Sequence, residues 1–444
     1  MKFAAAQLFH PSHALLAGVV VLAGCATTPQ ASLPAVQKEV AGRSGLQVAW
    51  PMTTDEKAAT DREVSKLLGE TFTADIAVQI AVLNNRSLRA SFEEIGISRA
   101  EFMAASRLHN PTFSGSVRWP EDRPRGPDVS LSLAADLLDN LLIPIRRKFA
   151  GAKLAQTEQH IAHEVLSLAA EVRIAALTVQ ARQQLRERIA AIVEVNDAGA
   201  DFAQRQYDAG NINRLELGNL QVIAQQTKLE LMRTELQLRA DREKLNRLLG
   251  LTGAQTEWKL ASDIPALPAQ EISFDALEDL ATHQRLDLAA AKSEVALAKQ
   301  ALGLKQKTRL LPAGVGVGIE TERESGGSRL TGPSLELGLP IFDQGQADLA
   351  RLSAEVRRAE AVYEGLLTDV RSEVRENRDS LVAARATAEF YTNTLLPQRR
   401  LLLRETLLHY NAMQKSNYEL LAAKEQQLVV EREAIEALRD YWIS

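Results

Sequence analysis

The sequence contains one long unit twice, and this duplication limits what the chain can fold into. Residues of the first half recur in the second half at a spacing that drifts only from 200 to 203 residues. The matched sets are Leu88, Ala90 and Glu94 with Leu288, Ala290 and Glu294; Pro111 with Pro312; Tyr207-Asp208-Ala209 with Tyr410-Asn411-Ala412; and Glu216-Leu217 with Glu419-Leu420. A repeat of this length is a whole supersecondary block, because solenoid repeats span only about 20–50 residues. We therefore expect two similar halves, 72–250 and 272–444, joined by a linker over 251–271 and related by a pseudo-two-fold axis.

The composition favours long helices over ordinary globular domains. Aromatic residues make up only 5% of the chain, and Ala, Leu, Glu, Arg and Gln crowd long stretches of it. This composition is typical of helices that pack as coiled coils. The net charge of −5 leaves no basic surface for nucleic acid, so we expect no nucleic-acid partner.

The N-terminus has the features of a lipoprotein signal. Residues 14–22 are apolar but too few to span a bilayer, which is typical of a signal-peptide core. They end in Leu22-Ala23-Gly24-Cys25, and small residues before a lone cysteine resemble the bacterial lipoprotein cleavage box. We expect residues 1–24 to be removed and Cys25 to carry acyl chains, each buried CH₂ contributing roughly 0.8 kcal/mol to anchoring. The alternative is an ordinary signal peptide with an incidental cysteine.

Proline and alternation patterns divide the rest of the chain. Residues 25–71 are expected to form a lipid-anchored tether, extended over 26–52, and a short helix from about Asp55 to Leu68. Each half is then expected to contain a helix, a β-hairpin and a long helical hairpin. The expected ranges are helix 73–108, β-hairpin 112–138 and helical hairpin 144–250 in the first half, and helix 273–307, β-hairpin 313–340 and helical hairpin 344–443 in the second. Gly250 is a natural C-cap, and Pro397 predicts a kink or break.

The strands of the two β-hairpins alternate in a way that suits a membrane barrel. Apolar residues such as Val129, Leu131 and Leu133 share one face, while Ser130 and Ser132 lie opposite. About ten residues is the length of a tilted transmembrane strand. An open four-stranded sheet cannot lie in lipid, because its edge N–H and C=O groups would be unsatisfied, and single-chain barrels start at eight strands. Three chains could share a barrel of twelve strands; the alternative is a soluble cap on a coiled coil.

These features together resemble the TolC-like family of outer-membrane efflux proteins, in its lipoprotein branch. The segments that carry the resemblance are 80–89, Gln284-Arg285-Leu286-Asp287-Leu288, Leu339-Pro340-Ile341-Phe342-Asp343-Gln344-Gly345, Leu395-Leu396-Pro397 and Tyr207-Asp208-Ala209-Gly210. The resemblance implies a mainly α chain with a small β part. Its long helical hairpins would form a trimeric α-barrel, and its four strands would contribute to a shared 12-stranded transmembrane β-barrel. It also implies a homotrimeric exit duct that docks through a periplasmic adaptor to an inner-membrane pump.

The resemblance also implies where the functional residues lie. In the family the adaptor contact and the entrance are at the helical turns, which here correspond to Gly210, Asn211 and Ile212 and to Met413, Gln414 and Lys415. Family members usually have Gly at both turns, so Met413 departs from the pattern. Segment 143–147 departs from the family's strand-to-helix turn as well. Glu216 and Glu419 match acidic positions that narrow the entrance. In a ring they would raise one another's pKa, but the favoured interpretation is that both are solvated surface glutamates.

No residue pattern indicates catalysis or a bound cofactor beyond the lipid on Cys25. His160 and His163 lie one helical turn apart beside Glu164, a spacing that could bind a metal, but a solvated helix face is the favoured interpretation. We therefore expect no enzyme and no metal site. The main alternative to a duct is a periplasmic adaptor lipoprotein that links pump and duct. The sequence names neither the transported substrate nor the class of pump.

Overall fold

The computed structural model describes residues 33–119, 127–259, 261, 264–271, 273–312, 314–323 and 327–444. The expected signal peptide 1–24 and the expected lipid attachment at Cys25 lie outside these residues. The tips of both β-hairpins, 120–126 and 324–326, also lie outside them.

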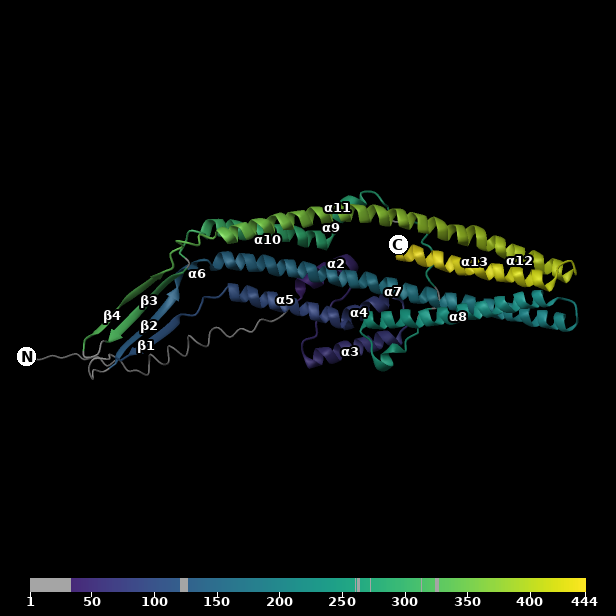
Figure 1. Ribbon diagram of the computed structural model, residues 1–444, viewed down its shortest axis with the longest axis horizontal. Coiled ribbons are helices and arrows are strands. Elements are labelled where there is room, and N and C mark those ends of the chain that lie inside the picture. Colours follow the sequence, from purple (N-terminus) through teal and green to yellow (C-terminus); the bar gives the residue numbers. More distant parts are fainter. Residues whose placement is uncertain are drawn as a thin grey trace, which may run out of the picture.

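The protein is an elongated helical body with a small β-sheet at one end (Figure 1). Helix α7, Ile143–Asp208, has 66 residues and runs along most of that body. At 1.5 Å per residue it is about 100 Å long. Helix α8, Arg214–Leu249, returns beside it as the second arm of the first helical hairpin. The turns of both helical hairpins lie at the end farthest from the sheet.

The first half contains a helix break that the sequence prediction missed. One helix over 73–108 was expected, whereas the chain forms α4, Ala74–Asn84, and α5, Arg86–Ala105. The side chain of Asn84 donates to the carbonyls of Leu249 at 2.9 Å and Gly250 at 3.0 Å. Asn85 caps α5 by accepting from the Leu88 N–H, and it donates to the carbonyl of Leu248 at 2.8 Å. The break therefore satisfies the C-terminal carbonyls of α8, which would otherwise lack partners.

The N-terminal segment is more helical than expected. An extended tether over 26–52 is wrong between Pro34 and Ser44, which form α2. Pro34 occupies the first turn, where its missing N–H costs nothing, and Val36 and Val40 are buried against the body. Helix α3, Thr54–Gly69, begins with a capping box between Thr53 and Glu56, close to the expected start at Asp55.

The main hydrophobic core lies where α2, α4, α5, α7 and α8 meet. The linker that follows α8 contributes Trp258, which stacks on Phe72 with ring centroids 4.7 Å apart. The guanidinium of Arg242 lies 4.0 Å from the Trp258 ring centroid, and the indole N–H donates to Asn246 at 2.8 Å. The linker begins with a short 3₁₀ turn, Gly253–Thr256. The contacts of Trp258 fix the linker to the helical body.

The second half repeats the order of elements. Helices α9, Leu277–Gln284, and α10, Leu286–Thr308, are separated at Arg285, where one helix was expected over 273–307. The remaining helices are α11, Gln346–Phe390; a π-helical turn η3, Tyr391–Leu395; α12, Leu396–Asn411; and α13, Asn417–Ile443. The π-helical turn ends two residues before Pro397, so the irregularity expected at this proline is a π-helical turn within a continuous helical backbone and not a break. Proline removes a backbone donor, and the helix widens where that donor is lost.

Both expected β-hairpins are present and join into one sheet. Strands β1, Thr112–Arg118, β2, Asp128–Asp136, β3, Val315–Arg323, and β4, Arg329–Leu337, pair in the order β1-β2-β3-β4, each antiparallel to the next. Pairing of β2 with β3 connects the two halves. A short helix α6, Leu137–Leu141, leads from β2 to α7. The strands are slightly shorter than the ten residues expected.

Across the part of the chain that the structure describes, no helix has both the length and the apolar character needed to cross a membrane.

Replacing Gly250 with Ala should destabilise the junction between α8 and α4. Gly250 has a φ of +68°, and a Cβ there would lie 2.6 Å from the carbonyl oxygen of Asn84. The left-handed backbone alone costs an L-residue about 1–2 kcal/mol, and the contact with backbone adds to it. Gly365→Ala in α11 is the matched control, because nothing lies within 4 Å of a Cβ there. Thermal unfolding followed by circular dichroism should show a lower midpoint for Gly250→Ala alone; equal midpoints would contradict the packing described.

Candidate functional site

The sheet has one apolar face, and the strand register brings its residues into rows. Phe113 pairs with Leu133, Leu133 with Ile319, and Val317 with Leu335. Directly paired residues lie on the same face of an antiparallel sheet. The exposed fractions on this face are large: 70% for Phe113, 62% for Ile319 and 66% for Leu335. Monomeric soluble proteins rarely expose a contiguous apolar surface of this kind, so the face requires an apolar environment.

The opposite face of the sheet is polar. Ser114 and Ser132 share a hydrogen bond of 2.7 Å, and Ser116 and Ser130 share one of 2.9 Å. Glu320 pairs in register with Ser132 and belongs to this face. The next carboxylates along β3 and β4 on this face are Glu322, which pairs with Arg118 at 3.4 Å, and Glu336. Four strands therefore separate a surface suited to lipid from a surface suited to water.

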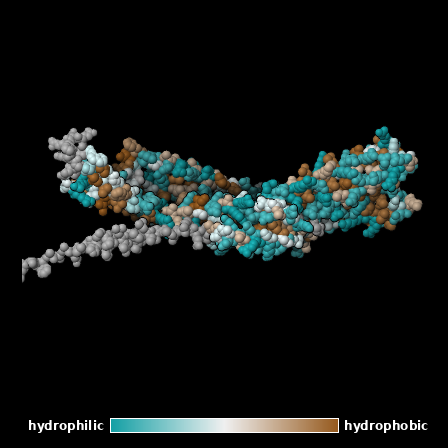
Figure 2. Space-filling view, turned by 90° about the horizontal axis from the view of Figure 1, so that it is seen from below, coloured by the Kyte–Doolittle hydropathy of each residue, from teal (hydrophilic) through white to brown (hydrophobic). Residues whose placement is uncertain are grey.

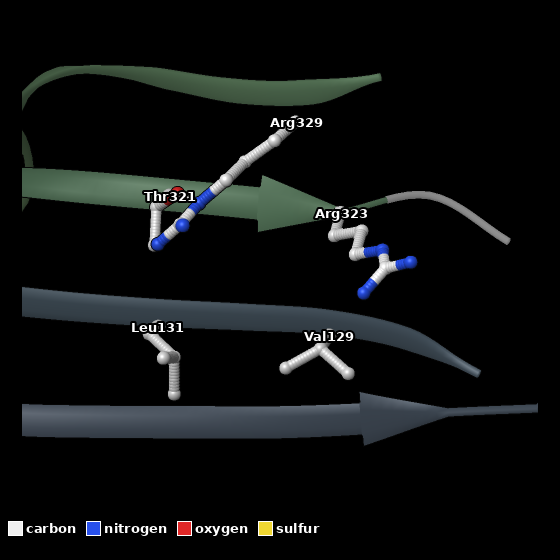
Figure 3. A pocket seen from close by; sticks show the side chains of 5 residues that line it. All are labelled: Val129, Leu131, Thr321, Arg323 and Arg329. Atoms are coloured by element: carbon white, nitrogen blue, oxygen red, sulfur yellow. Dashed lines mark hydrogen bonds between the residues drawn. The ribbon is translucent and has the colours of Figure 1, made fainter. Parts of the chain in front are cut away.

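The apolar face becomes polar near the β-hairpin tips. Figure 3 shows Val129 and Leu131 of β2 beside Thr321, Arg323 and Arg329 of β3 and β4, around a shallow depression. The guanidinium of Arg329 donates to the Thr321 hydroxyl at 3.0 Å. These residues bring together no nucleophile, acid and base. The depression marks where the apolar surface ends and is not a catalytic pocket.

The first helical turn contains the expected residues Gly210, Asn211 and Ile212. Gly210 adopts a left-handed conformation with a φ of +76°, and the Asn211 N–H closes the turn on the Gln206 carbonyl at 2.8 Å. Asn213 then caps α8 by accepting from the Glu216 N–H at 2.9 Å. Glu216 is exposed.

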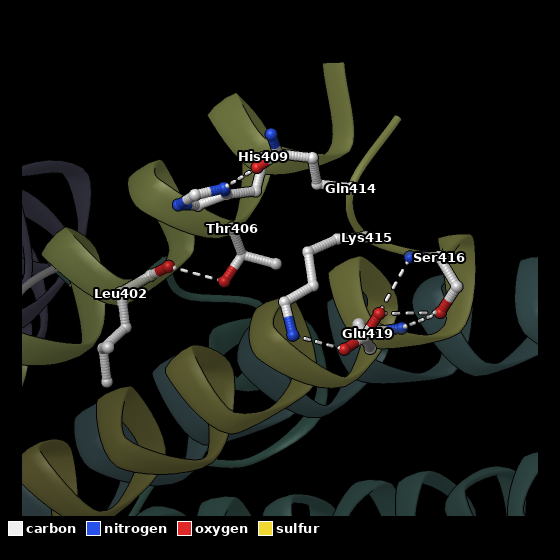
Figure 4. Close-up of polar contacts among 7 residues, drawn as sticks. All are labelled: Leu402, Thr406, His409, Gln414, Lys415, Ser416 and Glu419. Atoms are coloured by element: carbon white, nitrogen blue, oxygen red, sulfur yellow. Dashed lines mark hydrogen bonds and ion pairs between the residues drawn. The ribbon is translucent and has the colours of Figure 1, made fainter. Parts of the chain in front are cut away.

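The second turn has the same conformation with a different residue at its apex. Met413 adopts a left-handed conformation with a φ of +59°, and its side chain is 95% exposed. The Gln414 amide oxygen accepts a hydrogen bond of 2.6 Å from Nδ1–H of the His409 ring (Figure 4). A bulky apolar side chain is therefore held in solvent at the position where the first turn has Gly210.

Glu419 is held by local contacts at the start of α13. It forms a capping box with Ser416, and the Lys415 ammonium lies 2.6 Å from its carboxylate (Figure 4). The hydrogen bond from Lys415 and that from the Ser416 N–H lower the pKa of Glu419 to about 2. This direction is opposite to the one expected for a ring of carboxylates, because within one protomer Glu419 faces an ammonium and an amide instead of another acid.

Tyr418 lies between the two helical hairpins and was not singled out from the sequence. Its ring packs edge-on against Phe202 of α7, with centroids 5.4 Å apart. Burial and the nearby Glu216 carboxylate raise the pKa of Tyr418. Its buried hydroxyl has no hydrogen-bond partner among the described residues. A tyrosine adjacent to a capping residue carries no sequence signal of its own, so only the packing of α13 on α7 reveals it.

His160 and His163 both lie in α7. Nε2 of His160 lies 3.2 Å from the carboxylate of Glu164, one helical turn further along α7. His163 lies close enough to Asp287 of α10 to help lower the pKa of that carboxylate. Within the described residues, no group of three or more His, Cys, Asp or Glu side chains is placed to hold a metal ion.

Comparison with solved structures identifies the class of fold. The chain superposes on the outer membrane protein VceC from Vibrio cholerae with a TM-score of 0.66 and 16% identity, over 88% of this chain and 96% of that one. It superposes on the CmeC outer membrane channel of Campylobacter jejuni with a TM-score of 0.65 and 14% identity, over 94% of this chain and 91% of that one. No protein-family model and no curated protein sequence matches the chain. The chain has the TolC-like fold of outer-membrane channels, and the resemblance inferred from its sequence is confirmed for the fold.

Replacing Met413 with Gly should stabilise the second turn by up to about 1.5 kcal/mol. Removing the steric strain of an L-residue in the left-handed conformation stabilises the folded state by about 1–2 kcal/mol. Glycine, however, gains conformational entropy in the unfolded state, which costs roughly 0.5–1 kcal/mol. Because Met413 is 95% exposed, its removal loses little packing. The reciprocal change, Gly210→Met, should lower stability. Thermal unfolding of both variants checks this, and a loss of stability in Met413→Gly would contradict it.

Glu419 should make the second turn sensitive to acid. Its folded pKa of about 2 is below its ordinary value of 4.5, so its contribution is present above about pH 4.5 and is lost as the pH falls toward 2. Glu419→Gln should therefore lower the unfolding midpoint at pH 7 and have little effect near pH 2. Glu216→Gln is the matched control. Glu216 is three residues after its N-cap residue, as Glu419 is, but it forms no ion pair with another described residue. Equal pH profiles for the two variants would refute the role of Lys415 and Ser416.

Proposed function

We propose that this protein is the outer-membrane exit duct of a tripartite efflux system: a passive homotrimeric conduit from the periplasm to the exterior. The observation that carries the proposal is a four-stranded sheet with one apolar face, one polar face and two unpaired edges. A sheet with two such faces can separate lipid from water. Its apolar face suits lipid, and its polar face suits a water-filled lumen.

The free edges of β1 and β4 require partners from other chains. Every backbone N–H and C=O in a bilayer must be hydrogen-bonded, so a sheet with open edges cannot remain in lipid. The order β1-β2-β3-β4 leaves one side of β1 and one side of β4 available. Pairing β4 of one protomer with β1 of the next closes a barrel, and three protomers supply twelve strands. This is wide enough for an aqueous channel, whereas eight strands are filled by side chains.

The helical body would continue the same tube into the periplasm. Helix α7 is long enough, at about 100 Å, to cross a large part of that space. The α7–α8 turn, which contains Gly210, and the α12–α13 turn, which contains Met413, are both at the end of the body opposite the sheet. A periplasmic adaptor would dock there and connect the duct to an inner-membrane pump. Glu216 and Glu419 would lie at the entrance, and Cys25 would carry the lipid that anchors the chain to the outer membrane. Opening would be driven by the partners, with no catalysis in the duct.

Solved structures with this fold support the proposal through what their names state. CmeC is described as an outer membrane channel, and MtrE of Neisseria gonorrhoeae as an outer membrane channel in an open state. The alternative, a periplasmic adaptor lipoprotein, accounts less well for two helical hairpins and a four-stranded sheet whose apolar face is exposed. The transported substrate would be selected chiefly by the pump.

Substitutions on the two sheet faces should have different effects. Ile319→Arg places a charge in the middle of β3 on the apolar face and should destabilise the membrane-inserted form by about 2–4 kcal/mol. Glu320→Arg, one residue along and on the polar face, should leave insertion intact and shift ion selectivity toward anions. Folding into lipid vesicles and single-channel recordings in planar bilayers measure the two effects. The proposal fails if the two variants impair insertion equally, or if the unaltered protein forms no conducting trimer.

A further inference from the structure

A basic groove lies where the helical body meets the sheet, between the start of α7 and the end of α10. Its apolar lining includes Pro144, Ile145, Phe149 and Leu304, and its two cations are Lys148 and Lys307. We propose that this groove binds an anionic phospholipid from the periplasmic leaflet, with the lysines on the phosphate and the apolar residues on the first part of an acyl chain. This inference rests on the proposed outer-membrane location.

The two lysines carry charge that the described protein does not neutralise. Lys148 and Lys307 are both exposed, and neither forms an ion pair or a hydrogen bond through its ammonium with another described residue. Neighbouring cations differ in this respect: Lys305 lies 2.7 Å from Asp348, and Arg146 lies 3.8 Å from Asp139. Both unpaired ammonium groups line one groove and can attract an anion to it, because phosphate oxygens accept strong hydrogen bonds from ammonium groups.

The position of the charges on α7 gives a second reason to expect an anion. Arg146, Arg147 and Lys148 follow one another in the first turns of this helix, and its first turn contains no acidic residue. The N-terminus of a helix carries a partial positive charge, so cations are unfavourable there and anions are favourable. The sequence thus concentrates positive charge where the helix itself already attracts anions. An external anion would relieve that repulsion.

The apolar residues favour a lipid over free phosphate. Ile145 is 44% exposed and Phe149 is 36% exposed, and both line the same groove as the lysines. The segments that join this end of the helices to the strands also expose Leu310, at 64%, and Phe342, at 96%. The face in Figure 2 carries hydrophobic surface at the end of the molecule that holds the strands, whereas much of the shaft is hydrophilic. A lysine with its stem along apolar surface and its ammonium at a phosphate is a typical interfacial arrangement.

The groove lies at the depth that a headgroup would occupy. Helix α7 begins and α10 ends beside the sheet (Figure 1). The apolar rows of the sheet extend to Val315 and Leu337 at this end, so the boundary of the hydrocarbon region falls close to them. Lys148 and Lys307 lie in the helical body just beyond this boundary, where lipid phosphates are found. Juxtamembrane lysines at an anionic surface contribute to such binding individually.

The test is a titration of the detergent-purified trimer with phosphatidylglycerol, followed by native mass spectrometry. Phosphatidylcholine and inorganic phosphate serve as the neutral-lipid and free-anion probes. The double variant Lys148→Gln/Lys307→Gln should bind phosphatidylglycerol about thirtyfold more weakly than the unaltered protein, from the loss of two interfacial lysines. The control Lys38→Gln/Lys57→Gln removes two exposed lysines from α2 and α3 and should bind as the unaltered protein does.

The outcomes separate this inference from the proposed function. Weaker phosphatidylglycerol binding in the groove variant alone supports the lipid site. Unchanged binding in that variant, or equally tight binding of inorganic phosphate or phosphatidylcholine, overturns it. Channel recordings on the same preparations report on the duct: conducting trimers with unaltered lipid binding would refute only the groove. A protein that binds phosphatidylglycerol but never conducts would refute the duct and, with it, the location on which the inference rests.

Discussion

Unsatisfied backbone hydrogen bonds at the two sheet edges constrain how this protein can exist in a membrane. Strands β1 and β4 each present N–H and C=O groups along one free side, on a sheet with one exposed apolar face. In water the apolar surface is unfavourable, and in lipid the edges are unfavourable. Closure with further copies, as in the proposed trimer, would satisfy both requirements. The β2–β3 pairing suits such closure, because it joins the strands of the two halves into one continuous four-stranded sheet.

The helical body depends on contacts that hold separate helices as one shaft. Helix α4 ends at Asn84, and Asn85 separates it from α5. Both asparagine side chains donate to carbonyls at the end of α8, which attaches α4 and α5 to the first helical hairpin. The asparagine bonds satisfy carbonyls at the C-terminus of α8 that have no partner within the helix. The C-terminal end of the linker 251–271 is also held by side chains, because Arg385 and Tyr441 both donate to the Glu271 carboxylate. Burial and this carboxylate raise the pKa of Tyr441 to about 12. The bonds to Glu271 hold the linker to α11 and α13.

The sequence predicted well where local physics decides the structure. Alternation of small and apolar residues predicted the strands, Gly250 predicted the end of α8, and Pro397 predicted the irregular turn before α12. Prediction from the sequence failed where tertiary contacts determine the local structure. Helix α2 forms among prolines and glycines because Val36 and Val40 are buried against the body, and the break at Asn85 exists for carbonyls more than 160 residues away. Tyr418 and the groove between Lys148 and Lys307 depend on helices far apart in the chain, so no local pattern could reveal them.

Single-particle imaging of the protein in lipid nanodiscs tests the central claim most directly. The account predicts a three-fold tube whose membrane-embedded end is a closed sheet of twelve strands, with β4 of each protomer hydrogen-bonded to β1 of the next. The helical shaft should project to one side of the disc. A monomeric particle, or a trimer whose β1 and β4 edges remain unpaired or lie outside the lipid, would contradict the account.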